Sequence, residues 1–243
     1  MSDQIETLKL LLCQGGRIVT HKGLNECFGH LSARIPGEEK FLITTRGALA
    51  FVQPEHIEEV DFAGNKLTKR SKEGAPNELF LHAEVYKARP DVSAIARTQS
   101  KWCEIFGVRQ ESVRPVHSLG AILMGEAPVF DVPILGDVQV IGQGMVKQLG
   151  DRNAILLRGN GNVVLGRSVP EAVVRACFLD ESAWLQLQAR SLGESGVRYF
   201  DEEEVAILGR DLSRPDRIER AWDNWLNLAS VSMQRVGQVS VDS

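Results

Sequence analysis

The sequence predicts one α/β or α+β domain built around a mixed sheet. Helix-like and strand-like segments alternate along the chain, which favours a sheet with helices packed against it. Two pairs of neighbouring strands are joined by short turns, Pro36-Gly37-Glu38-Glu39 and Gly159-Asn160-Gly161. Such turns, and Asn-Gly above all, are typical of hairpins and therefore of antiparallel strands. We expect a mixed sheet and not a doubly wound parallel one.

The first half of the chain begins with a helix over residues 3–14, where Ile5, Leu8 and Leu12 repeat at helical spacing. Gly15-Gly16 is expected to end it. Strands follow over residues 31–35, 41–45, 57–62 and 92–99, with an exposed loop over 66–76 and a helix over 77–87. Asn77 is a suitable N-cap for that helix, and Pro90 ends it because the residue before a proline disfavours helical dihedrals.

The second half is expected to contain helices over residues 104–107 and 142–149, strands over 154–158 and 162–165, and a Pro- and Gly-rich segment with short strands over 108–140. Ser168 and Glu171 have the spacing of a capping box that opens a long helix to about residue 190. Two more helices follow, and Trp222 and Trp225 on the last serve packing or cover a neighbouring subunit's pocket. We predict a main domain over 1–200 and a helical extension over 201–243 that packs on it or on a neighbouring subunit.

Composition excludes several classes of protein. The 243 residues carry a formal net charge of -4, which gives no electrostatic reason to expect nucleic acid or an acidic membrane as partner. Hydrophobic residues make up 43%, yet no apolar run reaches the length of a membrane span, and no signal peptide is recognisable. The four cysteines are scattered, as reduced thiols in a cytoplasmic protein would be. No P-loop or dinucleotide motif is present, so we expect no organic cofactor.

A colinear set of motifs spans about residues 5–190. They are GHLSAR at 29–34, FLITT at 41–45, DFAG at 61–64, Asn77-Glu78 with His82, YKARPDV at 86–92, LLRGNG at 156–161, and Gly166 with Glu171-Ala172. With these motifs the chain resembles the class II aldolase/adducin family. The resemblance implies an αβα three-layer domain around a largely antiparallel sheet, and a homotetramer with active sites between subunits. It also implies a divalent metal that stabilises an enediolate or enolate formed by C–C cleavage.

Two features narrow the resemblance to one branch. Gly29-His30 replaces the Gly-Asn of many sugar-phosphate aldolases, and with the RAWDNW tail at 220–225 it is similar to a branch that contains decarboxylases of hydroxylated aromatic and pyridine carboxylates. Pro76-Asn77 stands where sugar-phosphate members have two serines, which weakens the phosphate pocket. We therefore expect a small anionic substrate, such as a hydroxylated carboxylate or an oxo acid.

The family's metal is held by three histidines, and the matching positions here are Arg97, Gln99 and Asn160. A guanidinium does not deprotonate to bind a metal, and amide oxygens are poor zinc ligands. We therefore predict a site without a metal, in which Arg97 replaces the ion's charge beside an oxyanion. Gln99 and Asn160 would then donate hydrogen bonds, while Glu78, at the position of the family's acid/base, or His30 would move protons.

Each of these residues also has a structural interpretation. Arg97 can pair with Glu78 and close an inactive site, and Asn160 suits the left-handed dihedrals of a tight turn. His82, four residues after Glu78, can orient that carboxylate or fill the core beneath it. Further candidates for substrate binding are Ser32, in the motif of His30, and Arg46, which follows a strand and can hold a carboxylate or be merely exposed.

The leading hypothesis is a metal-independent lyase, a decarboxylase or aldolase, that acts on such a carboxylate. Loss of the histidine triad also suits a noncatalytic member of the family, as adducin shows. An isomerase, dehydratase or cyclase with altered chemistry is a third alternative, because a site that stabilises an enolate serves many reactions.

Overall fold

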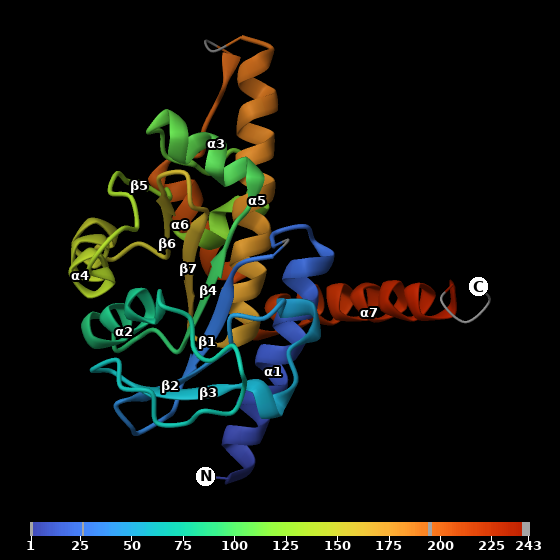
Figure 1. The fold of residues 1–243 in the computed structure, drawn as a ribbon. Coiled ribbons are helices and arrows are strands. Elements are labelled where there is room, and N and C mark those ends of the chain that lie inside the picture. Colours follow the sequence, from blue (N-terminus) through green and yellow to red (C-terminus); the bar gives the residue numbers. More distant parts are fainter. Residues whose placement is uncertain (1, 26, 194–195, 240–243) are drawn as a thin grey trace.

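The computed structural model describes residues 2–25, 27–193 and 196–239, and its centre is one sheet (Figure 1). Among the described residues, seven strands pair in the order β3-β2-β1-β4-β7-β6-β5. Their bounds are β1 His30–Arg34, β2 Lys40–Ile43, β3 Glu58–Asp61, β4 Ala94–Thr98, β5 Val129–Phe130, β6 Ala154–Leu157 and β7 Asn162–Gly166. Only β5 and β6 pair in parallel among these strands, so the predicted mixed and largely antiparallel sheet is confirmed.

Helices cover both faces of the sheet. Their bounds are α1 Ser2–His21, α2 Leu79–Ala88, α3 Lys101–Arg109, α4 Val138–Leu149, α5 Val169–Ser191, α6 Glu202–Leu212 and α7 Pro215–Val239, with 3₁₀ turns at Leu49–Phe51, Pro54–His56 and Ser118–Leu123. Figure 1 shows α2 and α4 on one side of the sheet and α1 and α5 on the other. This is the three-layer arrangement that the resemblance implies. None of the described helices combines the length and the apolar character that a membrane span requires.

The alternation of side chains along each strand divides the core into two halves. Leu31 and Ala33 of β1 belong to the half that packs against α1 and α5. Their neighbours His30 and Ser32 point to the opposite face, toward α2. Arg97 of β4 shares that face because it lies directly across the ladder from His30. The pleat of two adjacent strands thus places three polar side chains under one helix.

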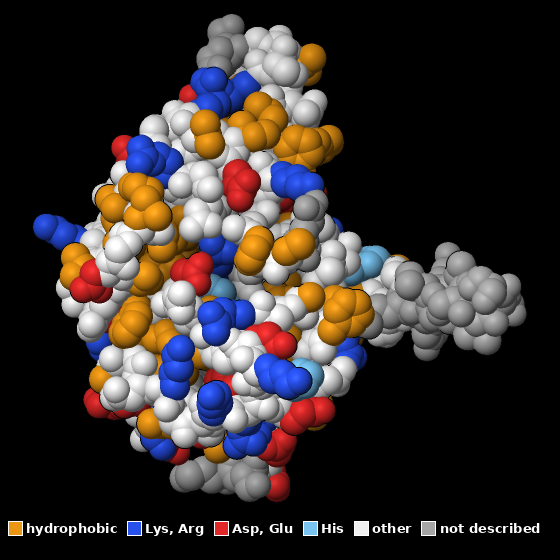
Figure 2. Space-filling model, in the orientation of Figure 1, with side chains coloured by type: hydrophobic (Ala, Val, Ile, Leu, Met, Phe, Trp, Pro, Cys, Tyr) orange, Lys and Arg blue, Asp and Glu red, His pale blue; other side chains and the backbone are white. Residues whose placement is uncertain are grey.

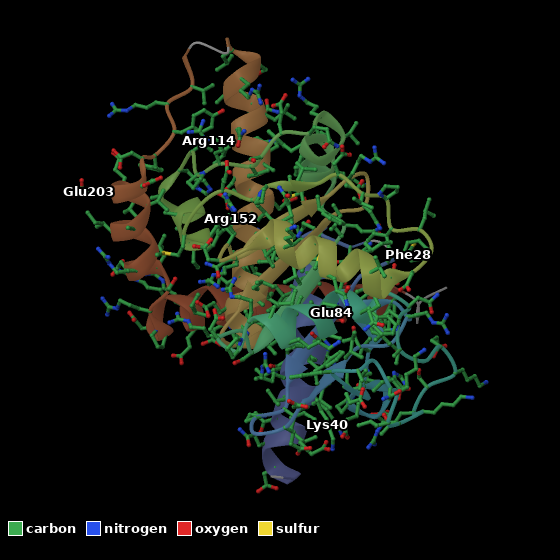
Figure 3. The ribbon with its side chains drawn as sticks, turned by 90° about the vertical axis from the view of Figure 1, so that its left-hand side faces the viewer. Phe28, Lys40, Glu84, Arg114, Arg152 and Glu203 are labelled. Carbon is green, nitrogen blue, oxygen red and sulfur yellow. The ribbon has the colours of Figure 1, made fainter. Side chains whose placement is uncertain are left out.

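Contacts with α4 hold α2 in position over this face. A Cβ on Gly142 of α4 would lie 2.9 Å from the backbone oxygen of Phe80, so the two helices approach too closely for any larger residue. Glu84 lies between α2 and α4 (Figure 3), where it accepts hydrogen bonds from Lys87 Nζ at 2.6 Å and from Gln139 Nε2 at 3.3 Å. The side chains on the inner face of α2 are therefore held at a fixed height above β1.

The expected end of the first helix at Gly15-Gly16 is wrong, because α1 continues to His21. The two glycines allow close packing instead of ending the helix. A Cβ on Gly15 would lie 2.9 Å from Leu31 Cδ1, and one on Gly16 would lie 2.5 Å from the backbone oxygen of Leu49. The helix gains more from this burial than the glycines cost in helix propensity.

Two capping expectations also need correction. The N-cap of α2 is Glu78 and not Asn77, and the Glu78 side chain makes no capping hydrogen bond. At α5, Ser168 Oγ accepts from Glu171 N as expected, at 3.2 Å. The Glu171 carboxylate, however, accepts from the backbone and side chain of Arg167, so only half of the capping box forms. Ion pairing with arginines competes successfully for that carboxylate.

The C-terminal helices pack on the same chain. Helix α6 packs against the 3₁₀ turn at Ser118–Leu123, and α7 packs against α1 and α5. The far part of α7 projects from the rest of the domain (Figure 1). Trp222 is buried in the core beside α1, and Trp225 packs edge-to-face on Phe178 with ring centroids 5.3 Å apart. Both tryptophans thus serve packing within the chain, and the domain boundary at residue 200 stays a prediction.

Candidate active site

The three positions that the sequence motifs predict to replace the family's metal ligands meet at one point. Arg97 Nη2 donates to Asn160 Oδ1 at 2.5 Å, and Gln99 Nε2 donates to the same oxygen at 3.0 Å. Arg97 and Gln99 lie two residues apart along and just beyond β4, so they point to the same side. Asn160 reaches them from the β6–β7 turn because β7 pairs with β4. Gln99 and Asn160 are half-buried above a buried Arg97.

Arg97 is a buried cation to which the described part of the chain offers no carboxylate partner. Its side chain is only 2% exposed, and its Nε has no hydrogen-bond partner. Burial lowers the pKa of the guanidinium, while the more distant charges of Glu78 and Glu104 favour its protonated form. No direct Arg97–Glu78 ion pair forms among the described residues, so the structure does not support the alternative in which this pair closes an inactive site. A buried charge without a partner is costly, and an anionic ligand would offset that cost.

These residues do not fit a divalent metal. The guanidinium of Arg97 is a permanent cation and carries only N–H donors. The oxygen of Asn160 that would face an ion already accepts two hydrogen bonds. Within the described part of the chain, no group of three His, Cys, Asp or Glu side chains is placed to hold a metal. The family's metal therefore has no matching donor set at this position.

A chain of four hydrogen-bonding groups begins beside Arg97. His30 Nδ1 lies 2.6 Å from His82 Nε2, and His82 Nδ1 lies 2.6 Å from Ser32 Oγ. Ser32 Oγ in turn lies 2.7 Å from the hydroxyl of Tyr86. At the other end, His30 Nε2 is buried and has no partner. Among the described residues, the site thus presents an imidazole nitrogen without a hydrogen-bond partner next to a guanidinium without a carboxylate partner.

The two imidazoles of this hydrogen-bonded series, His30 and His82, are neutral near pH 7. Burial, aided by the charge of Arg97, lowers the pKa of His82 to about 3. Burial, with His82 and Arg97, also lowers the pKa of His30 well below its ordinary value. A neutral His30 can still accept or donate one proton at Nε2 when an anionic ligand offsets the positive charge of Arg97 beside it.

His82 does not orient Glu78, contrary to one of the two interpretations of its spacing. Both of its ring nitrogens are occupied by His30 and Ser32. Glu78 is half-buried at the start of α2, one helical turn from His82, and acts on Arg97 through its charge. It remains available at the rim of the site.

Arg46 lies apart from this cluster. It is exposed, its Nε donates to the backbone oxygen of Glu73 at 2.6 Å, and its own backbone N–H donates to Gly74. These bonds fasten the loop over residues 66–76. Figure 2 shows lysine and arginine side chains gathered on the part of the surface that covers β2, β3 and the adjoining loops. A role for Arg46 in holding substrate stays a prediction.

Tyr86 is the residue of this constellation that sequence reasoning did not place in the site. The signal was the spacing of Glu78, the N-cap of α2, and of His82 and Tyr86 within α2, which follow one another at intervals of four residues. Only the position of Ser32 opposite α2 turns that spacing into a connected chain.

Comparison with known proteins agrees with the fold. The model of the class II aldolase and adducin N-terminal domain matches residues 11–187. A 3,4-dihydroxyphthalate decarboxylase of Arthrobacter keyseri is 32% identical over 221 residues, which cover 85% of this chain and 87% of the relative. An L-fuculose phosphate aldolase of Methanocaldococcus jannaschii is 26% identical over 160 residues, 65% of this chain and 83% of the relative.

A solved structure shows the same architecture. An aldolase II superfamily protein from Pseudomonas syringae superimposes with a TM-score of 0.80 at 21% identity, covering 96% of this chain and 95% of the other. The decarboxylases and aldolases among the relatives are lyases, in agreement with the reaction class expected from the motifs. Together with the fold, the match over residues 11–187 shows that this chain belongs to the class II aldolase/adducin family.

Proposed function

We propose that this chain is a lyase that decarboxylates a small hydroxylated carboxylate and uses Arg97 in place of the family's metal. The observation that carries the proposal is the buried guanidinium without a carboxylate partner, next to the unpartnered Nε2 of His30. Relatives named 3,4-dihydroxyphthalate decarboxylases support decarboxylation over retro-aldol cleavage.

In this proposal the negative charge of the substrate completes the site. A carboxylate or an adjacent oxyanion accepts hydrogen bonds from Arg97, whose N–H fork suits two oxygens at once. The amide groups of Gln99 and Asn160 fix the orientation of the substrate at the rim. When the C–C bond breaks, its electron pair stays on the organic fragment, where the guanidinium stabilises the developing charge. CO2 leaves, and His30 or Glu78 supplies the proton that replaces it.

The test is release of CO2 from 3,4-dihydroxyphthalate and related hydroxybenzoates by chelator-treated protein, with and without added Zn²⁺ or Mn²⁺. We expect turnover that added metal does not raise. Arg97→Lys keeps the charge but not the fork, and we expect at least a tenfold loss, as for removal of a preorganised donor. Arg214→Ala is the matched control, because Arg214 is exposed and pairs only with surface carboxylates in the described structure.

Each outcome decides between specific alternatives. Turnover that depends on added metal would refute the role of Arg97. Binding of these carboxylates without product would instead favour a noncatalytic member of the family. Conversion without CO2 would favour an isomerase, dehydratase or cyclase at the same site.

Association of several copies is also part of the proposal. The segment 132–140 exposes Val132, Leu135 and Val140, and hydrophobic side chains gather over α4 in Figure 2. Apolar side chains concentrated in this way are typical of interaction surfaces. Light scattering on the purified protein would test the expected tetramer, and a monomeric mass would contradict it.

A further inference from the structure

We infer that His30, His82, Ser32 and Tyr86 form a proton relay, which connects the Arg97 site with a hollow on the other end of α2. The inference rests on the proposed function, because it assigns the relay to the proton steps of that reaction. Its four members are buried, and each carries a nitrogen or oxygen that can both give and take a proton.

The spacing of strand and helix explains why these groups form a continuous chain. Residues two apart on a strand are separated by about 6.7 Å, and residues four apart on a helix by about 6 Å. His30 and Ser32 on β1 therefore keep nearly the same step as His82 and Tyr86 on α2. The two pairs alternate across the layer in a zigzag, with contacts of 2.6 Å, 2.6 Å and 2.7 Å.

The chain has two ends with different surroundings. One end is His30 Nε2, beside Arg97. The other is Tyr86, which lines an open hollow of about 800 Å³ together with Arg34, Phe62 and Lys87. The Arg34 guanidinium lies 4.9 Å from the centre of the Tyr86 ring and donates to the Tyr86 backbone oxygen at 2.7 Å. Burial raises the pKa of the Tyr86 phenol, and the Ser32 hydrogen bond and the Arg34 charge offset this only in part, so in the relay Tyr86 exchanges its proton as a neutral group.

The protons of the four groups can be arranged along the hydrogen bonds in two ways, and both arrangements contain the same number of protons. In the first, Nε2 of His30 is bare, and each N–H or O–H points from His30 toward Tyr86. In the second, every bond is reversed, and Nε2 of His30 carries the proton. The neighbouring Arg97 charge favours the first arrangement, because a lone pair facing a cation is more favourable than an N–H. Neither arrangement places a charge on any of the four groups.

Switching between the arrangements moves one proton through the protein. When a substrate hydroxyl gives its proton to His30 Nε2, each group passes one proton on, and Tyr86 releases one to the hollow. After the C–C bond breaks and CO2 leaves, the electron pair on carbon takes the proton of His30 Nε2. The relay then refills from water at Tyr86 and returns to its first arrangement. The product leaves as an oxyanion that water protonates, so the reaction consumes one proton overall.

Nitrogen-15 NMR of protein labelled in its five histidines would test the relay without any need for turnover. We expect His30 in the wild type to carry its proton on Nδ1. Ser32→Ala removes the acceptor of the His82 Nδ1 proton, and Tyr86→Phe removes the acceptor of the Ser32 proton. Either substitution should therefore move the proton of both His82 and His30 to Nε2. Tyr199→Phe, which alters the only other tyrosine, and Ser191→Ala, on an exposed helix end, should leave both rings unchanged.

A kinetic measurement complements the spectrum. With a substrate in hand, we expect Ser32→Ala to lower kcat about 100-fold, the usual contribution of positioned proton transfer, with little change in KM. Unchanged ring protons in both variants would overturn the relay. Switched ring protons without turnover on any tested carboxylate would support the relay and refute the proposed function.

Discussion

Replacing Arg97 by methionine distinguishes an anion-binding centre from a structural tie. Arg97 contributes one hydrogen bond, to Asn160 Oδ1, and that oxygen keeps its second donor, Gln99 Nε2, when the arginine is removed. This loss is opposed by the cost of burying a guanidinium that is 2% exposed and forms no ion pair with any carboxylate of the described residues. Methionine fills a similar volume without a charge.

The expected magnitude follows from these two opposing contributions. Replacing buried ionic groups by hydrophobic side chains of similar volume changes stability by about 0 to 4 kcal/mol in the favourable direction. Subtracting about 1–2 kcal/mol for the lost hydrogen bond leaves a range from a loss of about 2 kcal/mol to a gain of about 3 kcal/mol, centred on a gain of about 0.5 kcal/mol. For a chain of this length a gain of about 0.5 kcal/mol raises Tm by about 1–2 °C.

Thermal and urea unfolding at one protein concentration would measure the change. Arg175→Met is the matched control, because Arg175 is equally buried but pairs with Glu171 at 3.1 Å and donates to the backbone of Leu165 and Ile122. Its removal should cost about 3 kcal/mol or more, since Glu171 loses a buried partner. A loss of more than about 2 kcal/mol in Arg97→Met would refute the reasoning and show that Arg97 stabilises the fold.

Three further predictions concern stability. In the folded protein His82 has a pKa of about 3 and binds no proton between pH 6.5 and pH 5, whereas in the unfolded chain it does. The contribution of His82 to the free energy of unfolding is therefore complete above pH 6.5 and should fall by about 2 kcal/mol at pH 5. Urea unfolding at both pH values should show a shallower pH dependence for His82→Gln, and an unchanged slope would contradict the assigned pKa. Gly16→Ala should destabilise by about 1–3 kcal/mol, since its Cβ meets the backbone of Leu49, whereas Gly144→Ala faces only the movable ring of Phe130 and should be neutral or stabilising by thermal melting. Ser168→Ala should cost about 1 kcal/mol in the same assay by removing the N-cap of α5, and no loss would mean that the Arg167–Glu171 pair alone secures this helix end.

Much of the fold could be predicted from local patterns. The hairpin turns at residues 36–39 and 159–161 identified antiparallel pairs, because such turns impose their pairing on the strands beside them. The end of α1 could not be predicted in the same way. Gly15-Gly16 usually indicates a helix end, but here Leu49 and Leu31 approach from distant parts of the chain and favour glycine inside the helix.

For the site, too, some features followed from the sequence and others only from the tertiary structure. By itself the sequence determined the family, because colinear motifs carry that information. It also predicted that Arg97, Gln99 and Asn160 replace the three metal ligands, and it named the candidates His30, Ser32, Glu78 and His82. Only the tertiary structure decided that His82 bonds to His30 and Ser32 and not to Glu78, that Tyr86 completes the chain, and that Arg97 stays without a carboxylate. The physical reason is that each of these contacts joins segments about fifty or more residues apart. Their partners depend on which face of β1 meets which face of α2, and local spacing along either segment cannot specify that.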